Sequence, residues 1–136
     1  MNLPTKTDLK REGFLYEATL LYGTLAKRIK KWPPGHRRTI GDQMLRASLS
    51  VVSNYAEGFG RRGLQQVKFV DIAQGSLQEL IGQIRAAMCA GLLDYRFARG
   101  QRARLHDLLR ELCEIQVSRG KMSPQRRDML LTEFRL

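Results

Sequence analysis

Residues 53–63 read SNYAEGFGRRG, and Gly58, Gly60 and Gly63 within them complete a G-x-G-x-x-G pattern. In dinucleotide-binding folds this pattern follows a strand and opens a helix inside a βαβ unit. The residues before it instead carry apolar side chains at helical spacing, and no stretch of the chain alternates with the two-residue period of a strand. We therefore interpret the glycines as a turn between two helices, because glycine adopts left-handed backbone conformations at little cost.

Apolar side chains repeat every three or four residues through the rest of the chain as well. The sequence predicts an all-α fold, an antiparallel up-down-up-down four-helix bundle with a short C-terminal helical extension, in a single domain over residues 1–136. The first helix should stop at Trp32-Pro33-Pro34-Gly35, because proline disfavours helical geometry in the residue before it. Helices are expected at about 8–31, 39–58, 64–92 and 101–118, with a short helix at about 124–134.

The composition of the chain indicates a globular protein. Hydrophobic residues make up 43% of the 136 residues, which is typical of a globular domain. Cys89 and Cys113 lie on apolar helical stretches without a C-x-x-C spacing, so we interpret them as buried thiols in a reducing compartment. No signal peptide or membrane-spanning run is evident, and we expect a cytoplasmic protein.

The net charge is +11, and a basic excess of this size usually meets nucleic-acid phosphates. The up-down topology would gather most of it at the end that holds residues 24–42 and 92–104, where only Asp42 and Asp94 oppose ten cations. Solvated helix ends are the alternative interpretation. The predicted phosphate-binding residues are Lys27, Arg28, Lys30, Lys31, Arg37, Arg38, Arg96, Arg99, Arg102 and Arg104. Within this end Trp32 and His36 could stack on unpaired bases, or Trp32 could cap the hydrophobic core.

The apolar residues of the helix at 39–58 span an arc of about 200°, wider than the roughly 100° stripe that one packing face needs. We therefore expect a homo-oligomer whose interface contains Leu45, Leu49, Val52, Ala56 and Phe59. Four further residues are interpreted as structural: Asn54, Glu57, Gly58 and Gly60. A carboxylate in the last turn of a helix is unfavourable, so Glu57 should pair with Arg61 or Lys68.

The stretch WPPGHRRTIGDQMLRASLSVVSNYAEGFGR at 32–61, followed by FVDIAQGSLQELIGQI at 69–84, resembles the bacterial family of the 23S rRNA intervening-sequence proteins. The resemblance implies an antiparallel four-helix bundle, often assembled as a homopentamer, with no established enzymatic activity. A related branch comprises the accessory variability proteins of diversity-generating retroelements, basic pentamers that bind a reverse transcriptase and its RNA. The high charge and the segment 35–41, GHRRTIG, resemble that branch, whereas SNYAEG at 53–58 resembles the rRNA-associated one.

A catalytic site does not emerge from the sequence. His36 and His106 are the two histidines, and neither lies in an H-x-x-x-H or E-x-x-H arrangement. We expect a non-enzymatic protein without metal or cofactor that binds RNA, and a reverse transcriptase is a candidate partner. The alternative is a protein-interaction scaffold whose charge meets acidic protein partners without direct contact to nucleic acid.

Overall fold

The computed structural model describes the backbone of residues 6–136 and the side chains of residues 13–136, and this part of the chain is all-α, without a strand. The helices are α1 (Lys6–Ile29), α2 (Pro34–His36), the π-helical segment η1 (Arg37–Gly41), α3 (Asp42–Phe59), α4 (Gly63–Cys89), α5 (Tyr95–Ser118) and α6 (Pro124–Glu133). Because α2, η1 and α3 follow one another without a break, they form one helical run from Pro34 to Phe59.

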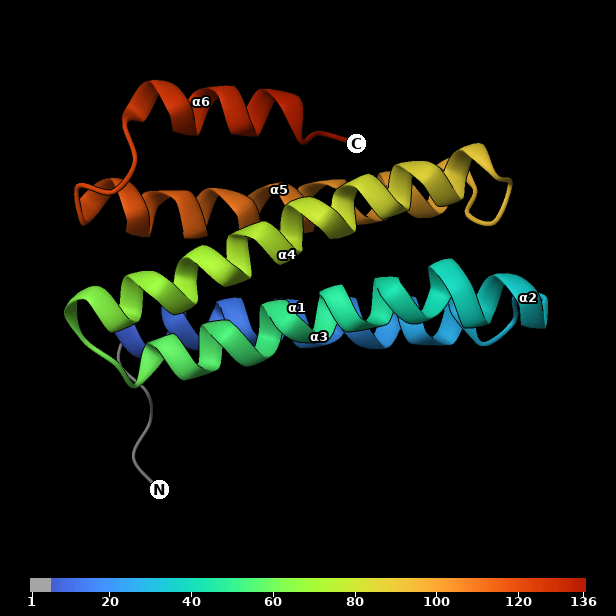
Figure 1. Cartoon of the computed structure of the whole chain (residues 1–136), viewed down its shortest axis with the longest axis horizontal. Helices are drawn as coiled ribbons and strands as arrows, with labels where there is room; N and C mark the ends of the chain where they lie inside the picture. Colours follow the sequence, from blue (N-terminus) through green and yellow to red (C-terminus); the bar gives the residue numbers. More distant parts are fainter. Residues whose placement is uncertain (1–5) are drawn as a thin grey trace.

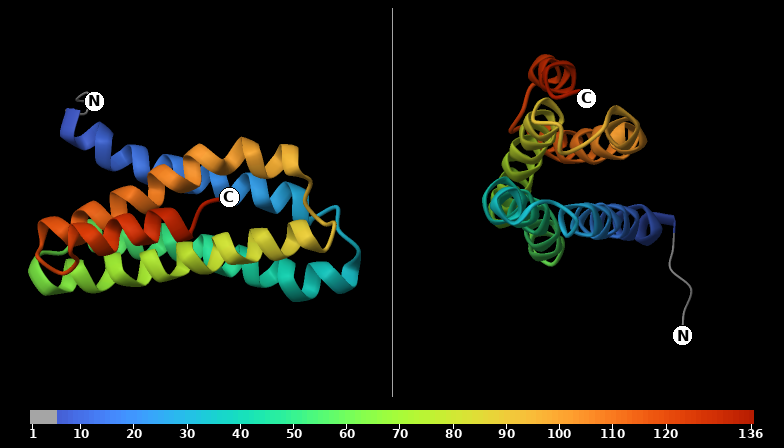
Figure 2. Two further views of the ribbon diagram at one scale, coloured as in Figure 1. Left: turned by 90° about the horizontal axis from the view of Figure 1, so that it is seen from above. Right: turned by 90° about the vertical axis from the view of Figure 1, so that its right-hand side faces the viewer.

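The four long helices lie along the longest axis of the molecule, and consecutive ones run in opposite directions (Figure 1). α3 packs most extensively on α4, while α1 packs against α3 and α5, and α4 also packs against α5. The contact between α1 and α5 is the least extensive of these, and the two helices are well separated in the end-on view of Figure 2. α6 folds back along α5.

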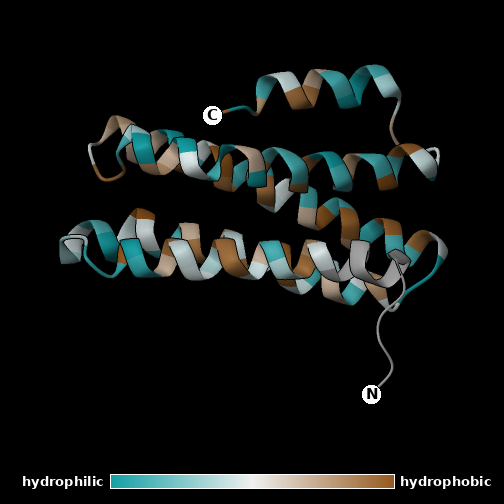
Figure 3. Ribbon diagram, turned by 180° about the vertical axis from the view of Figure 1, so that it is seen from behind, coloured by the Kyte–Doolittle hydropathy of each residue, from teal (hydrophilic) through white to brown (hydrophobic). Residues whose placement is uncertain are grey.

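One core runs the length of the molecule, because each long helix contributes apolar residues from one stripe. Figure 3 shows hydrophobic and hydrophilic residues interleaved along every long helix, as expected for amphipathic helices with a shared interior. Phe14 of α1 stacks on Tyr55 of α3, with ring centroids 3.9 Å apart. Outside the helices, Trp32, Leu93 and Met122 extend the core into the connections.

The connections depend on glycines with left-handed backbone geometry. Gly91 and Gly120 have φ angles of 74° and 69° and follow α4 and α5. The amide of the next residue reaches back in each case, from Leu92 N to Ala87 O at 2.9 Å and from Lys121 N to Gln116 O at 2.8 Å. These bonds are those of a Schellman motif, which satisfies carbonyls at a helix end.

The turn between α3 and α4 differs in detail from the sequence prediction. Of the three glycines there, Gly63 alone is left-handed, with a φ of 59°, and it begins α4. Gly60 caps α3 in a right-handed conformation, and Gly58 is buried inside α3. An added Cβ at Gly58 would lie 3.1 Å from Phe69 Cβ, so this glycine permits close packing of α3 on α4 and does not turn the chain.

Two helices begin earlier than the sequence predicts. The run expected from about 39 begins at Pro34, because proline suits the first position of a helix, where its missing N–H is not needed. The helix expected from about 101 begins at Tyr95, where the Asp94 carboxylate accepts a hydrogen bond from Phe97 N at 2.7 Å and caps the helix.

The two cysteines have different environments. Cys113 is buried, and burial together with the neighbouring Glu114 raises its pKa from 9.0 to about 11. Cys89 is exposed, so the prediction that both thiols are buried is wrong for this residue. Within residues 6–136, no helix has the length and apolarity required to cross a membrane.

Candidate nucleic-acid interface

The C-terminal end of α1, the α2–η1 segment and the N-terminal end of α5 meet at one end of the molecule, which we call the basic end (Figures 1 and 2). The ten cationic residues predicted for this end are exposed, except Arg37 and Arg104, which are partly buried. The chain therefore brings positive charge from two connections, far apart in sequence, to one surface.

A groove of about 400 Å³ lies between α1 and α5 at the basic end, and we call it the basic groove. Among the residues that the structure describes, four cations line it and no carboxylate does. Its lining consists of Thr24, Lys27, Arg28, Lys31, Arg96, Phe97, Gly100 and Gln101. Because the cations are contributed by both helices, an anion in the groove would be bound from two sides, and phosphate is the anion that such Lys and Arg sets bind in nucleic acids.

Asp94 organises one wall of the basic groove. Its carboxylate caps α5 through Phe97 N, and Oδ2 lies 3.7 Å from Arg28 Nη1. The Arg28 guanidinium carbon lies 4.7 Å from the centre of the Phe97 ring, so the charged group packs over the aromatic face. Arg28 is therefore held between a carboxylate and a ring, and its side chain remains 44% exposed.

The structure does not bring all ten predicted residues into the groove. Arg104 pairs with Glu17, with Nε 2.7 Å from Oε2, and also donates to Gln101 Oε1 at 2.8 Å. Arg102 lines a different hollow, beside the C-terminal residues Phe134 to Leu136. Arg37 donates to Lys30 O at 3.3 Å across the α1–α2 connection. Lys30, Arg38 and Arg99 are exposed at this end without lining the groove.

Trp32 and His36 occupy different positions at the basic end. Trp32 is 7% exposed and belongs to the core, which agrees with its interpretation as a hydrophobic cap and removes it as a stacking platform. His36 is exposed in α2. The following turn is π-helical, with Asp42 N donating to Arg37 O. An added Cβ at Gly41 would lie 2.7 Å from Ile29 Cγ2, so this glycine allows the end of α1 to touch the start of α3.

Four groove residues were missing from the prediction: Thr24, Phe97, Gly100 and Gln101. The predicted phosphate ligands are all cationic, whereas these residues carry no charge. Their sequence signal is weak, since Thr24 precedes Arg28 by one helical turn and Phe97 precedes Gln101 by one turn. Only the packing of α1 on α5 shows that the two pairs face the same groove.

The predicted oligomer interface follows the surface of α3. Leu49 is 48% exposed and Phe59 is 41% exposed. Ala56 is also exposed, while Leu45 and Val52 are partly buried against the core. The five residues follow one another at spacings of four, three, four and three, so they form one apolar stripe along the helix.

Comparison with known proteins identifies the family. Residues 16–115 match the family described as 23S rRNA-intervening sequence protein. The chain belongs to this family. No curated protein and no solved structure matches the chain. The basic groove, whose residues lie between Thr24 and Gln101, falls within the part that matches, whereas α6 lies outside it.

Two of the residues interpreted as structural hold polar contacts in this member of the intervening-sequence protein family. Asn54 Nδ2 donates to Ser50 O at 2.9 Å and to Ser50 Oγ at 3.0 Å, and Ser50 Oγ lies 2.7 Å from Ser76 Oγ of α4. Glu57 accepts a hydrogen bond from Arg61 Nε at 3.1 Å, and Arg61 is one of its two expected partners. These contacts join α3 to α4 and connect the last turn of α3 to the residues that follow it.

The helix outside the family match is tied to the rest by charged groups. Arg85 of α4 donates to Glu133 O at 2.7 Å and also to Arg135 O. Arg127 of α6 pairs with Glu114 of α5 at 3.0 Å, and Ser123 caps α6 by accepting from Arg126 N at 3.1 Å. The C-terminal helix expected from Ser123-Pro124 is thus present and docked on α4 and α5.

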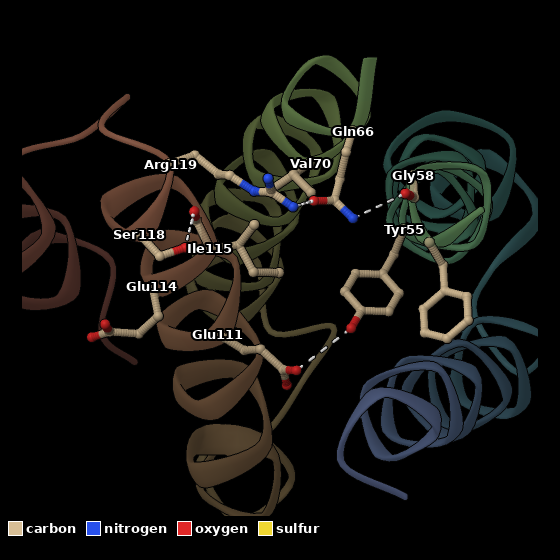
Figure 4. Close-up of a pocket in the computed structure, with 10 residues that line it drawn as sticks. Tyr55, Gly58, Gln66, Val70, Glu111, Glu114, Ile115, Ser118 and Arg119 are labelled. Atoms are coloured by element: carbon tan, nitrogen blue, oxygen red, sulfur yellow. Dashed lines mark hydrogen bonds between the residues drawn. The ribbon is translucent and has the colours of Figure 1, made fainter. Parts of the chain in front are cut away.

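Another hollow, of about 330 Å³, lies at the end of the molecule opposite to the basic end and is drawn in Figure 4. Tyr55 and Glu111 point toward each other across it, with the phenol donating to the carboxylate at 3.5 Å. Glu114 also lines this hollow, and Arg119 is the one cation among its described lining residues. Two carboxylates against one guanidinium do not suit a phosphate. Among the side chains that the structure describes, no three His, Cys, Asp or Glu residues are grouped to hold a metal ion.

Proposed function

We propose that the protein is a non-enzymatic, RNA-binding member of the intervening-sequence protein family that binds RNA phosphates at its basic end. The basic groove is the observation that supports this proposal best, because the described residues that line it include four cations, from α1, the turn after α1 and α5, and no carboxylate. Membership of the family is compatible with a role at ribosomal RNA. We place this role in the cytoplasm.

The proposed architecture is an antiparallel up-down-up-down four-helix bundle formed by α1, α3, α4 and α5. The apolar stripe on α3 is proposed to contact a second copy, and the resemblance to the family suggests five copies. Each copy would present one basic groove, so one RNA could occupy several grooves at once. Such multivalency raises the overall affinity well above that of a single site.

A narrower form of the proposal is an accessory role for a retroelement reverse transcriptase. The net charge of +11 and the GHRRTIG segment that forms the end of α2 and η1 favour this form. Purification of the protein from its host, with sequencing of the bound RNA and identification of the bound proteins, distinguishes the two roles. A reverse transcriptase with one template RNA supports the retroelement role, and rRNA fragments alone support the ribosomal one.

RNA binding itself is tested by titrating the purified protein into labelled RNA at several salt concentrations. The logarithm of the affinity should fall against the logarithm of the salt concentration with a slope of about −0.7 to −0.9 for each phosphate bound. The double variant K27Q/K31Q should weaken binding and make this slope less steep by about 1.4–1.8, while K121Q/R126Q, at the opposite end, should change it little. A flat salt response would overturn the proposal. Binding that needs an added acidic protein would support the scaffold alternative instead.

Self-association is tested by light scattering. The wild-type protein should have a mass several times 15.6 kDa at micromolar concentration. Leu49→Lys places a charge in the apolar stripe and should shift the equilibrium toward monomer, whereas Gln125→Lys on the exposed surface of α6 should not. A monomeric wild-type protein would contradict this part of the proposal.

A further inference from the structure

The guanidinium of Arg28 covers the Phe97 ring at the mouth of the basic groove. Its carbon lies 4.7 Å from the ring centre, and Phe97 itself is only 7% exposed. The ring therefore cannot serve as a platform for a ligand. The Arg28 side chain is 44% exposed, so part of the planar guanidinium remains accessible to solvent.

An arginine packed in this way presents a flat surface as well as a charge. Nucleobases stack on guanidinium planes as they do on aromatic rings, and this is one of the ways in which proteins recognise unpaired RNA bases. Asp94 helps to hold the plane, because its carboxylate lies 3.7 Å from Arg28 Nη1 and caps α5 next to Phe97. Arg28 thus combines a restrained position with an accessible surface.

The other groove cations surround this platform. Lys27 lies on α1 beside Arg28, Lys31 lies in the turn that follows α1, and Arg96 contributes from α5. Thr24 and Gln101 add a hydroxyl and an amide, which are groups that can hydrogen-bond a base edge or a 2′-hydroxyl. The groove, at about 400 Å³, therefore contains a stacking plane, phosphate-binding cations and neutral polar groups within the space of a single nucleotide.

We infer that the basic groove binds one unpaired nucleotide of the RNA, with its base stacked on the Arg28 guanidinium and its phosphate between Lys27, Lys31 and Arg96. The inference rests on the proposed RNA binding and makes it more specific. Within an A-form duplex both faces of each base are covered by neighbouring bases, so a duplex offers only its backbone to the groove. Single-stranded RNA should therefore bind more tightly than a duplex with the same charge per strand.

The test compares Arg28→Lys with the wild type, because lysine keeps the charge and removes the plane. The probes are a fluorescent single-stranded oligouridylate and a blunt RNA duplex of equal length. Stacking of one base on a side chain corresponds to about a 5-fold to 150-fold change in affinity. Arg28→Lys should weaken single-strand binding at least about 5-fold on that basis, leave duplex binding nearly unchanged and keep the salt slope of the wild type. Arg110→Lys, on the exposed surface of α5 and outside the groove, is the matched control and should behave as the wild type.

A second readout follows the base directly. An oligonucleotide that carries 2-aminopurine should lose fluorescence on binding the wild type and lose less on binding Arg28→Lys, since this fluorophore is quenched by stacking. Equal single-strand affinities for wild type and Arg28→Lys, with the salt slope intact, would overturn the stacking inference and leave phosphate binding in place. Equal affinity of the wild type for single strand and duplex would also overturn it. If the wild type shows no salt-dependent binding to either probe, the proposed function itself fails.

Discussion

Replacing Gly41 with alanine is expected to destabilise the protein, although alanine normally favours a helix. The added Cβ would lie 2.7 Å from Ile29 Cγ2 and 3.3 Å from His36 O, with Trp32 Cε3 at 3.6 Å. Ile29 is 1% exposed and cannot move away without displacing other core residues. Overpacking of this kind costs about 1–3 kcal/mol, and the gain from replacing a helical glycine is at most about 1 kcal/mol. With the middle values of both ranges, about 2 and about 0.5 kcal/mol, the net loss in the free energy of unfolding should be about 1.5 kcal/mol.

Gly82→Ala is the matched control, because Gly82 lies inside α4 and an added Cβ would meet no atom within 4 Å. This variant should be more stable than the wild type by roughly 0.5–1 kcal/mol. Urea denaturation at one fixed protein concentration measures both effects, since self-association makes stability depend on concentration. If Gly41→Ala is as stable as the wild type while Gly82→Ala gains stability, the close contact between α1 and α3 does not exist as described. A weaker affinity of Gly41→Ala for RNA would further indicate that this contact positions the basic end.

Two further predictions concern buried polar groups. Gln116 Nε2 donates to Gln74 Oε1 at 2.6 Å between α5 and α4, so Gln116→Leu leaves that oxygen buried without its donor and should cost about 1–3 kcal/mol in the free energy of unfolding. The double variant Q74L/Q116L should recover most of this loss in urea denaturation, and a double variant as unstable as the single one would contradict the explanation. The raised pKa of Cys113 means that the unfolded chain binds fewer protons than the native one above pH 9, so stability should fall as the pH rises from 9.0 to about 11. Cys113→Ala should reduce this dependence of stability on pH. In the native wild type, a thiol reagent should label the exposed Cys89 before Cys113. An unchanged pH dependence of stability in Cys113→Ala, or equal labelling rates of the two thiols, would count against the burial of Cys113.

Helical periodicity was sufficient to predict an all-α protein, because residues such as Phe14, Leu21 and Leu25 share one helical stripe whatever their tertiary partners are. Helix boundaries were less predictable where one residue type has two roles. Pro34 follows Trp32-Pro33 and predicts the end of a helix, yet the same proline occupies the first position of the next one. Gly58 was assigned to a turn, but it lies inside α3 because Phe69 of α4 approaches it.

The charge at the basic end could be located from topology alone, whereas the groove could not. The topology predicts that ten cations lie at one end. In the structure Arg28 lines the basic groove, Arg102 lines the hollow beside Phe134 to Leu136, and Arg104 pairs with Glu17. These different positions depend on the rotation of α1 and α5 about their own axes. The same applies to Arg28 over Phe97, a contact between residues that have the whole of α3 and α4 between them in the sequence. No pattern within either helix specifies that register.

The π-helical turn at Arg37–Gly41 has a consequence for how the length of this protein can vary. A π turn accommodates one additional residue in a helix while the residues on either side keep their orientation. Loss of one residue in this segment would convert it to an ordinary α-helical turn, and the core stripe of α3, from Met44 to Tyr55, would still face α1 and α4. Loss of one residue further along α3 would rotate everything after it by about 100° and turn the stripe away from the core. Natural relatives that differ in length by one residue should therefore differ at this turn, beside the surface that we assign to RNA.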